Sequence, residues 1–257
     1  MKHEAYELMD SLATSHWWYK ARLEILCSQI EEKLVDCKVK ILDYGGGTGA
    51  LAKALSSHGH NVTVADVSDY ALDRCRTGGL DTIDIKRETI PIANFNCIVV
   101  GDVLEHVEDD VGLLVELRKS LAPGGIVVVT VPAYEFLWSG EDYCSDHLRR
   151  YDKRMLMSCL TKAGLKPGKV SYFNTLLFPL AAAAIMYKRI FKPRDLYRSN
   201  VEAVSEQLNK ILYRIFAFEK HLLHRLNQPF GMSLLAIAEP DKVEVVCDAR
   251  SVSLSVR

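Results

Sequence analysis

The sequence has no apolar run long enough to cross a membrane. Its longest one, at 176–187, contains Pro179 and four consecutive alanines, whereas a membrane-spanning helix needs about 20 apolar residues. Basic residues follow it at once: Lys188, Arg189, Lys192, Arg194 and Arg198. The pattern therefore predicts either a core-packing helix with a solvated basic end, or a helix that uses 176–198 to rest on an anionic membrane surface or to grip an amphiphilic substrate.

The sequence also lacks an excess of charge of one sign, with a formal net charge of −1. It shows no basic and aromatic recognition motif, so we expect no nucleic-acid partner. Its seven cysteines form no C-x-x-C pair and have no nearby histidines at metal-ligand spacing. We therefore expect reduced thiols and no metal. The odd cysteine count, with no signal peptide at the start, predicts a cytoplasmic protein.

What the sequence does contain is a glycine-rich loop between a strand and a helix. The apolar run 39–42 leads into Asp43-Tyr44-Gly45-Gly46-Gly47-Thr48-Gly49, helical spacing follows over 50–57, and a second apolar run ends at Asp66. Glycines at such a turn let the backbone bend sharply and approach a ligand closely. Ligands of open α/β sheets bind at the carboxyl ends of the strands, where an acid can accept both ribose hydroxyls. Asp66 is therefore a candidate ribose ligand.

Two cofactors are compatible with this arrangement. Gly45, Gly47 and Ala50 satisfy the G-x-G-x-x-A pattern of dinucleotide sites. The carboxylate of Asp43, however, would repel a pyrophosphate and suits a cationic ammonium or sulfonium group. The pattern D-x-G-x-G-x-G, with an acid ending the second strand, resembles the nucleotide loop of class I S-adenosylmethionine-dependent methyltransferases.

The resemblance extends to about Pro240. The segment 97–107 is similar to the fourth strand and following loop of that family, and 121–132 to its next turn and fifth strand. A block with Trp138, Asp142, His147 and Arg149-Arg150-Tyr151 resembles a bacterial subgroup with W-S-x-x-D and H-x-R-R-Y motifs. The segments 16–19, together with Arg22, and 229–234 resemble the same subgroup. One departure is that 86–89 lacks the usual adenine-side acid, which leaves backbone amides near Arg87, or Glu88, as alternatives.

The order of the predicted elements indicates an α/β fold. Strands are expected near 39–43, 61–65, 81–85, 96–101, 125–131, 168–173 and 232–238, with helices between them, and this alternation predicts a parallel sheet covered on both faces. The resemblance implies a Rossmann-like class I methyltransferase sheet of seven strands, the last one antiparallel. We expect an N-terminal helical cap over 1–38, a methyltransferase domain over 39–240 with a helical lid inserted at about 174–226, and a tail over 241–257.

The resemblance also implies which residues bind S-adenosylmethionine. The expected cofactor-binding residues are Asp43, Gly45, Gly46, Gly47, Gly49, Asp66, Val67, Asp102 and Val103. The expected substrate-binding residues are Trp18, Tyr134, Trp138, Arg149, Arg150 and Tyr151. A purely structural role is an equal alternative for the aromatic start of the cap, which could pack against the sheet. The same holds for the loop with Asp142, His147, Arg149, Arg150 and Tyr151, which could be an ion-paired anchor for the next helix.

The candidate catalytic residues are His106 and His147. A methyl group on sulfonium mainly needs alignment with its acceptor, but a hydroxyl acceptor also needs a base, and histidine titrates near neutral pH. Helix capping or packing beside Glu105 is the structural alternative for His106. The sequence thus predicts methyl transfer to a small-molecule, lipid-linked or glycan-related metabolite, with O-methylation favoured. An NAD-dependent oxidoreductase and a noncatalytic S-adenosylmethionine-binding protein are the alternatives.

Overall fold

The computed structural model describes residues 12, 15–34, 38–192 and 204–241. Most of the predicted N-terminal cap before residue 15, all but the first residue of the predicted tail 241–257, and the basic residues Arg194 and Arg198 lie outside these ranges. The structural statements below concern the described residues.

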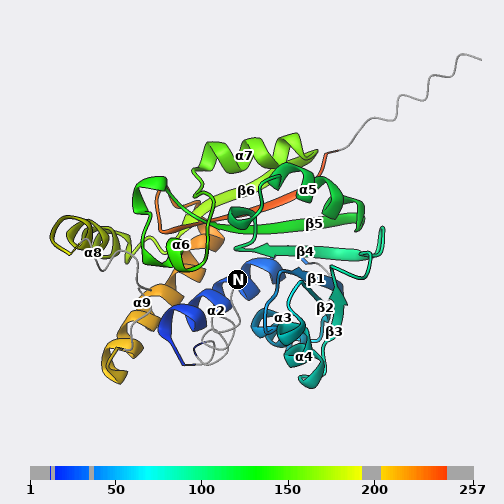
Figure 1. Cartoon of the computed structure of the whole chain (residues 1–257), viewed down its shortest axis with the longest axis horizontal. Coiled ribbons are helices and arrows are strands. Elements are labelled where there is room, and N and C mark those ends of the chain that lie inside the picture. Colours follow the sequence, from blue (N-terminus) through cyan, green and yellow to red (C-terminus); the bar gives the residue numbers. More distant parts are fainter. Residues whose placement is uncertain (1–11, 13–14, 35–37, 193–203, 242–257) are drawn as a thin grey trace, which may run out of the picture.

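Seven strands form one mixed sheet in the order β3-β2-β1-β4-β5-β7-β6. Strand β7 pairs antiparallel with β5 and β6, whereas the other neighbours pair in parallel. The strands are β1 (Lys40–Tyr44), β2 (Asn61–Asp66), β3 (Asp81–Asp84), β4 (Phe95–Gly101), β5 (Leu121–Pro132), β6 (Leu165–Phe173) and β7 (Ser233–Pro240). The predicted seven-stranded sheet with an antiparallel last strand is confirmed (Figure 1).

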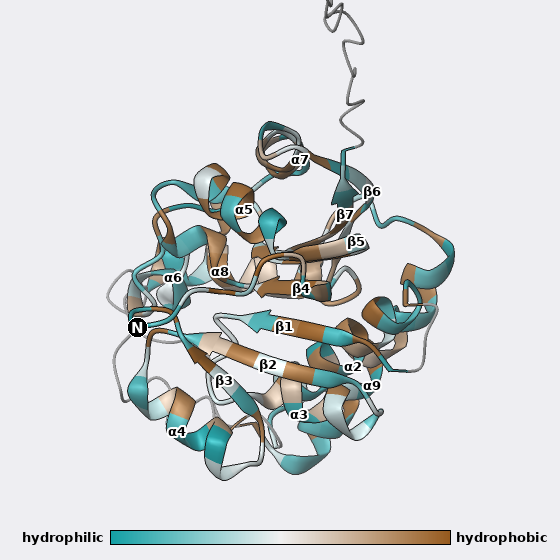
Figure 2. Ribbon diagram, turned by 90° about the vertical axis from the view of Figure 1, so that its right-hand side faces the viewer, coloured by the Kyte–Doolittle hydropathy of each residue, from teal (hydrophilic) through white to brown (hydrophobic). Residues whose placement is uncertain are grey.

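Helices cover both faces of this sheet (Figure 2). They are α2 (Trp17–Glu31), α3 (Ala50–Ser57), α4 (Asp69–Thr77), α5 (Asp110–Lys119), α6 (Gly140–Cys144), α7 (Lys153–Lys162), α8 (Phe178–Phe191) and α9 (Glu206–Arg225), with the short 3-10 helices η1 (Leu104–His106) and η2 (Glu135–Leu137). Side chains of a strand alternate between faces, so Leu42 packs in the cluster under α5 and α7, and Ile41 in the one under α2, α3 and α9.

The central strands are apolar along their whole length because both of their faces are covered. Cys97, Ile98, Val99 and Val100 in β4 have no exposed surface. Continuous apolar runs of this kind are typical of buried parallel strands. The parallel strands end at the same edge of the sheet. Apart from Trp18 of α2, the site residues predicted from the sequence lie at the ends of β1, β2, β4 and β5 or in the loops that follow them.

The helical segment predicted as a lid divides into two parts. Helix α9 packs along α2, where Asn209 Oδ1 accepts a hydrogen bond from the Trp17 amide at 2.8 Å and Lys220 pairs with Glu24 at 3.1 Å. Phe216 of α9 is fully buried. Most of α9 therefore belongs to the layer that covers the sheet, and a lid function remains a prediction for α8.

Helix α8 is mostly exposed and stands at one end of the molecule (Figure 1). Ile185 is its one buried residue, and the large apolar side chains of Leu180, Ile190 and Phe191 are each about two-thirds exposed. Within 176–187, only Leu177, which precedes α8, and Ile185 are buried. The interpretation of this segment as a core-packing helix is therefore wrong, because two apolar side chains are too few to anchor it in the core. No helix in the described part of the chain combines the length and apolar content that crossing a membrane requires.

Candidate active site

The glycine loop between β1 and α3 fits tightly against two other site residues. Gly45 has φ +71°, and a Cβ built on it would lie 2.5 Å from Cγ2 of Val103. A Cβ on Gly46 would lie 2.6 Å from the Asp43 carboxyl group. A larger residue at either position would meet these atoms, and at Gly45 it would also adopt a strained backbone. The fold thus brings the loop, Asp43 and Val103 together, and cofactor binding by them remains a prediction.

Asp66 holds this loop from the end of β2. Its Oδ2 accepts a hydrogen bond from the Gly47 amide at 3.0 Å, and its Oδ1 accepts one from the Ser68 amide at 2.8 Å. The side chain is buried, and the next residue, Val67, is about half exposed. Asp66 therefore fixes the glycine loop relative to β2.

Asp43 is a buried carboxylate that lacks a full set of partners. It is 3% exposed, and its Oδ2 has no hydrogen-bond partner among the described residues. Burial, followed by the charge of Asp66, raises the pKa of Asp43 to about 7. Burying a carboxylate without a partner is costly, and a cationic group would offset that cost. This orphaned oxygen, with the close-fitting glycines beside it, fits the sulfonium and ammonium charges of S-adenosylmethionine.

Arg22 connects helix α2 to the ends of β4 and β5, and the sequence analysis assigned it no role. Its Nη2 lies 2.6 Å from Oδ2 of Asp102 and donates to Oγ1 of Thr130 at 2.7 Å. The guanidinium also lies over the ring of Trp18, 5.4 Å from its centroid. These contacts bring Trp18 and Asp102 to one region, and the spacing of Trp18 and Arg22 by one helical turn was the signal that could have indicated it.

Asp84 is another acid that the sequence analysis missed. It ends β3 in register with Asp66 of β2 and is 3% exposed. It accepts a hydrogen bond from the Lys86 amide at 2.9 Å and lies 3.1 Å from the Arg87 guanidinium, while Glu88 accepts from the amide of Asp84. The acid thus lies at the end of the third strand and organises the loop in which we expected adenine contacts.

Asp142 is the centre of a buried anchor for the loop after β5. Arg150 donates to both of its oxygens at 2.7 Å, and the Ser139 amide donates at 2.7 Å. Nδ1 of His147 lies 2.8 Å from Oδ1. Burial opposes ionisation of Asp142, but the hydrogen bonds from His147 and Arg150 outweigh it and hold the pKa of Asp142 below its usual range.

The other two members of the Arg149-Arg150-Tyr151 run also have partners within the protein. The Tyr151 hydroxyl donates to Asp110 at 2.7 Å and the ring is buried. Arg149 donates to the same carboxylate at 3.3 Å. These contacts support the structural alternative for Arg150 and Tyr151, and acceptor binding by Arg149 remains a prediction.

Tyr134 belongs to a group of aromatic residues at the carboxyl end of β5. Its ring stacks on Tyr172 of β6 at a centroid distance of 5.0 Å and lies 5.3 Å from Phe136 and 6.0 Å from Phe178 of α8. Phe178 in turn lies 5.4 Å from Phe230. We call these five residues the aromatic wall; Phe136 and Phe230 are partly exposed.

Trp138 lies just beyond this wall and contacts α8 through its backbone. Its carbonyl oxygen accepts a hydrogen bond from Nη2 of Arg189 at 2.9 Å. Its ring lies 6.0 Å from that of Tyr143. Trp138 therefore joins the loop after β5 to the exposed helix, and acceptor contact by its ring remains a prediction.

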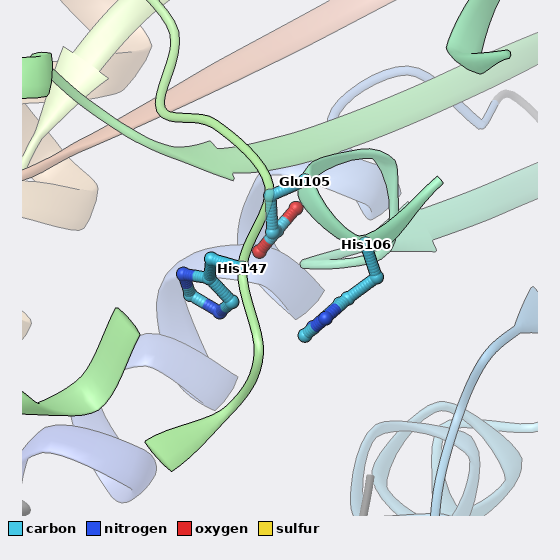
Figure 3. Close-up of side chains that lie close together, drawn as sticks. All are labelled: Glu105, His106 and His147. Atoms are coloured by element: carbon cyan, nitrogen blue, oxygen red, sulfur yellow. The ribbon is translucent and has the colours of Figure 1, made fainter. Parts of the chain in front are cut away.

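The two candidate catalytic histidines lie together although they are 41 positions apart. Their ring centroids are 4.7 Å apart, and the buried Glu105 carboxylate lies beside them (Figure 3). The Leu148 amide donates to the Glu105 carbonyl at 2.8 Å and so fixes the two loops to each other. Burial and the neighbouring His147 lower the pKa of His106, which favours its neutral imidazole. The sequence analysis treated Glu105 only as a packing neighbour.

Known proteins that resemble this chain are methyltransferases. Residues 17–169 match the family described as a methyltransferase domain. A ubiquinone biosynthesis O-methyltransferase of Actinobacillus pleuropneumoniae is 31% identical over 40% of this chain and 52% of its own length. A ubiquinone/menaquinone biosynthesis C-methyltransferase of Coxiella burnetii is 29% identical over 48% of this chain and 53% of its own. The chain thus spans about half the length of these curated relatives.

A solved structure shares the fold over nearly the whole chain. It is an S-adenosylmethionine-dependent methyltransferase from Archaeoglobus fulgidus, 18% identical, which matches 91% of this chain and 98% of its own with a TM-score of 0.57. At that identity the likeness concerns the fold. The family match, with the orphaned Asp43 oxygen, assigns S-adenosylmethionine as the cofactor in place of the NAD alternative.

Proposed function

We propose that this chain, which belongs to the methyltransferase domain family, methylates a hydroxyl group of a small acceptor with an apolar part. It is an S-adenosylmethionine-dependent enzyme, and the proposal concerns its acceptor. The observation that carries the proposal is that a histidine pair and the aromatic wall both lie at the carboxyl edge of the sheet. His106 follows β4 and Tyr134 follows β5, so both lie beyond the carboxyl ends of neighbouring parallel strands.

The cofactor residues would lie beside this pair. Asp43 would face the cationic part, Asp66 would take the ribose, and Asp102 with Val103 would form the wall after β4. When bound, S-adenosylmethionine supplies a methyl group on a sulfonium centre, whose sulfur leaves as a neutral thioether without needing a proton. The remaining chemical demand is on the acceptor, which must lose its hydroxyl proton.

The histidines can meet that demand. The neutral imidazole of His106 is favoured, because burial disfavours its charged form. His147 bonds to Asp142 through Nδ1, which leaves Nε2 as its second ring nitrogen. An imidazole within reach of the hydroxyl could therefore take its proton as a general base. The polar loop 140–151 would hold the acceptor head.

An apolar part of the acceptor would contact the aromatic wall and α8. Besides the partly exposed Phe136 and Phe230, α8 presents Leu180, Tyr187 and Ile190 to solvent. Exposed apolar patches of this kind mark ligand or membrane contacts. The two relatives are methyltransferases of ubiquinone and menaquinone biosynthesis, which supports an amphiphilic acceptor. A contact with an anionic membrane surface through α8 is part of the same proposal.

The test is transfer of a labelled methyl group to matched acceptors. One pair of phenols differs only in an alkyl tail, and a second pair compares each phenol with its methyl ether. We expect product from the tailed phenol, less from the short one and none from the ethers. His106→Gln should lower kcat by about 10²-fold or more, the usual contribution of a general base, while the surface variant His58→Gln should not. Methylation of purely polar acceptors alone, or of nitrogen, would contradict the proposal.

A further inference from the structure

Glu105 is the least expected residue near the histidine pair. The residue has no exposed surface, and neither carboxylate oxygen has a hydrogen-bond partner among the described residues. Asp142, which is equally buried, accepts hydrogen bonds from Arg150 and Ser139. A native protein rarely leaves a buried carboxylate unpaired without a reason, so the missing partner of Glu105 indicates a cationic ligand.

The neighbours of Glu105 are suited to share such a ligand. One ligand atom each of Glu105, His106 and His147 lies within 4.8 Å of the others, and Figure 3 shows the carboxylate beside the two imidazoles. Two ligands about 2.1 Å from one ion are at most about 4.2 Å apart. Small rotations of these side chains would therefore bring all three atoms to coordination distance.

His147 already has the second partner that metal-binding histidines usually have. Its Nδ1 lies 2.8 Å from the Asp142 carboxylate, which leaves Nε2 as the ring nitrogen that could bind a metal. A carboxylate on the far nitrogen fixes the ring and its tautomer in many metal sites. Arg150 and Ser139 hold that carboxylate in turn. The anchor of the loop after β5 would thus orient a metal ligand.

We propose that Glu105, His106 and His147 bind a divalent first-row transition metal ion, with Zn²⁺ as the reference case. Two imidazoles and one carboxylate suit Zn²⁺ and its neighbours better than Mg²⁺, which prefers all-oxygen sites. Three protein ligands leave a coordination position open, as in catalytic zinc sites.

The role of the ion rests on the proposed hydroxyl acceptor. The open position would bind the acceptor oxygen, and the ion would lower the pKa of that hydroxyl. In the metal-bound enzyme the imidazoles are ligands, the hydroxyl proton passes to water, and the ion takes the place of the general base. The binding of the ion itself does not depend on the identity of the acceptor, so the two proposals can fail separately.

The test measures metal binding without any acceptor. The full chain, freed of metal with a chelator, is titrated with Zn²⁺ by calorimetry, and Co²⁺ is added separately to record its visible absorption. We expect one ion to bind per chain and the Co²⁺ absorption to be typical of a low coordination number. Mg²⁺ should bind much more weakly. Glu105→Gln, which keeps the shape of the side chain, and His106→Ala should each weaken binding at least about tenfold.

A matched control uses another histidine that has a carboxylate neighbour. His58 bonds to Glu31, and His60 lies 3.9 Å from the same oxygen. His58→Ala should leave the affinity and the Co²⁺ spectrum unchanged. Circular dichroism checks that each variant is folded, and Glu105→Gln should be at least as stable as the wild type because it removes an unpaired carboxylate.

Each result decides between clear alternatives. Absence of Zn²⁺ binding, or binding that is lost in His58→Ala and kept in Glu105→Gln, would overturn the metal site. If metal binding fails while the tailed phenol is methylated, O-methylation stands with the histidines as bases. If Zn²⁺ binds at Glu105 but no hydroxyl compound is methylated, the metal site stands and the proposed acceptor is wrong.

Discussion

Two kinds of buried acid lie in this protein, and they differ in what surrounds them. Asp142 accepts hydrogen bonds from Arg150 and Ser139 and bonds to His147, so that its pKa is held low. Asp43 and Glu105 are just as buried, but each keeps at least one oxygen without a hydrogen-bond partner among the described residues. Burial raises the pKa of both.

This difference distinguishes carboxylates that support the fold from carboxylates that bind a ligand. A carboxylate whose partners are all in the protein stabilises the fold, and it needs no ligand. A carboxylate that the fold leaves incomplete destabilises the free protein and gains a partner when a cationic ligand binds. On this basis we infer that Asp142 anchors a loop, that Asp43 binds the cofactor and that Glu105 binds a metal ion.

The largest effect on stability is expected from a substitution in the loop anchor around Asp142. Arg150→Ala would leave Asp142 buried with its main cationic partner gone, so we expect the free energy of unfolding to fall by about 3–5 kcal/mol. Urea denaturation measures it. Arg154→Ala, at an exposed position of α7, should change it by less than about 0.5 kcal/mol. Equal effects of the two substitutions would mean that the anchor contributes little.

Removing the Asp43 carboxylate, which lacks a full set of partners, should instead raise the free energy of unfolding. Asp43→Asn removes a buried carboxylate that lacks a partner, so we expect the ligand-free protein to gain about 1–3 kcal/mol of stability at about pH 8. Asp73→Asn, which alters an exposed acid, is the matched control and should be near neutral. A loss of stability in Asp43→Asn would show that Asp43 is satisfied in a way that the structure does not show.

The stability gain should depend on pH. The pKa of Asp43 is about 7 in the folded chain, above its ordinary value of about 3.9 in the unfolded chain. Between these values the folded state binds the extra proton, so wild-type stability falls as the pH rises through this window. The advantage of Asp43→Asn should therefore grow from about pH 4 to about pH 7. An advantage that stays constant in urea titrations across this range would contradict the assignment.

The same proton should affect cofactor binding. A cationic ligand favours ionised Asp43, so the affinity for S-adenosylmethionine should fall as the pH drops below about 7, by up to about tenfold per unit. Calorimetry between about pH 5.5 and 7 avoids the titration of the ligand's own amino group, whose pKa is about 8. Asp43→Asn should bind weakly with a flat profile. An equally flat profile for the wild type would remove Asp43 from the ligand's cationic end.

The smallest effect is expected on the exposed helix. Leu180→Ser and Ile190→Ser alter side chains that are about two-thirds exposed, so stability should change by less than about 0.5 kcal/mol. We expect KM for the tailed phenol to rise several-fold, while KM for the short phenol stays the same. Ile92→Ser, at an exposed position away from α8, is the control. A uniform change for both phenols would place the apolar contact elsewhere.

The sequence predicted the sheet and the cofactor loop because these features are local. Strands with continuous apolar runs, and a glycine loop that begins with the acid Asp43, can be recognised within a short window of the sequence. The roles of Arg22 and Glu105 could not be predicted in this way. Arg22 donates a hydrogen bond to Thr130, which is 108 positions away in the sequence. In the sequence Glu105 looks like any other acid, and only the fold shows that its carboxylate has no hydrogen-bond partner among the described residues.

Contacts between distant parts of the sequence also explain why the helical segment at 174–226 differs from the single lid that was predicted. Its apolar residues suggested one lid, but α9 packs along α2 through contacts almost 200 positions apart, such as that of Asn209 with Trp17. Within the part of the chain that the structure describes, helix α8 packs along no other helix and is mostly exposed. Tertiary contacts decide which of the two helices packs against another helix, and the hydrophobic periodicity of the sequence does not predict this.

The central claim is that the incomplete carboxylate and the glycine loop form the cofactor site. The most direct test is calorimetric titration of the wild type with S-adenosylmethionine and S-adenosylhomocysteine, repeated on Asp66→Ala and Asp43→Asn with NAD as control. We expect both adenosyl ligands to bind the wild type, each variant to lose at least about tenfold in affinity, and NAD not to bind. Binding of NAD alone, or adenosyl binding that neither substitution weakens, would contradict the claim.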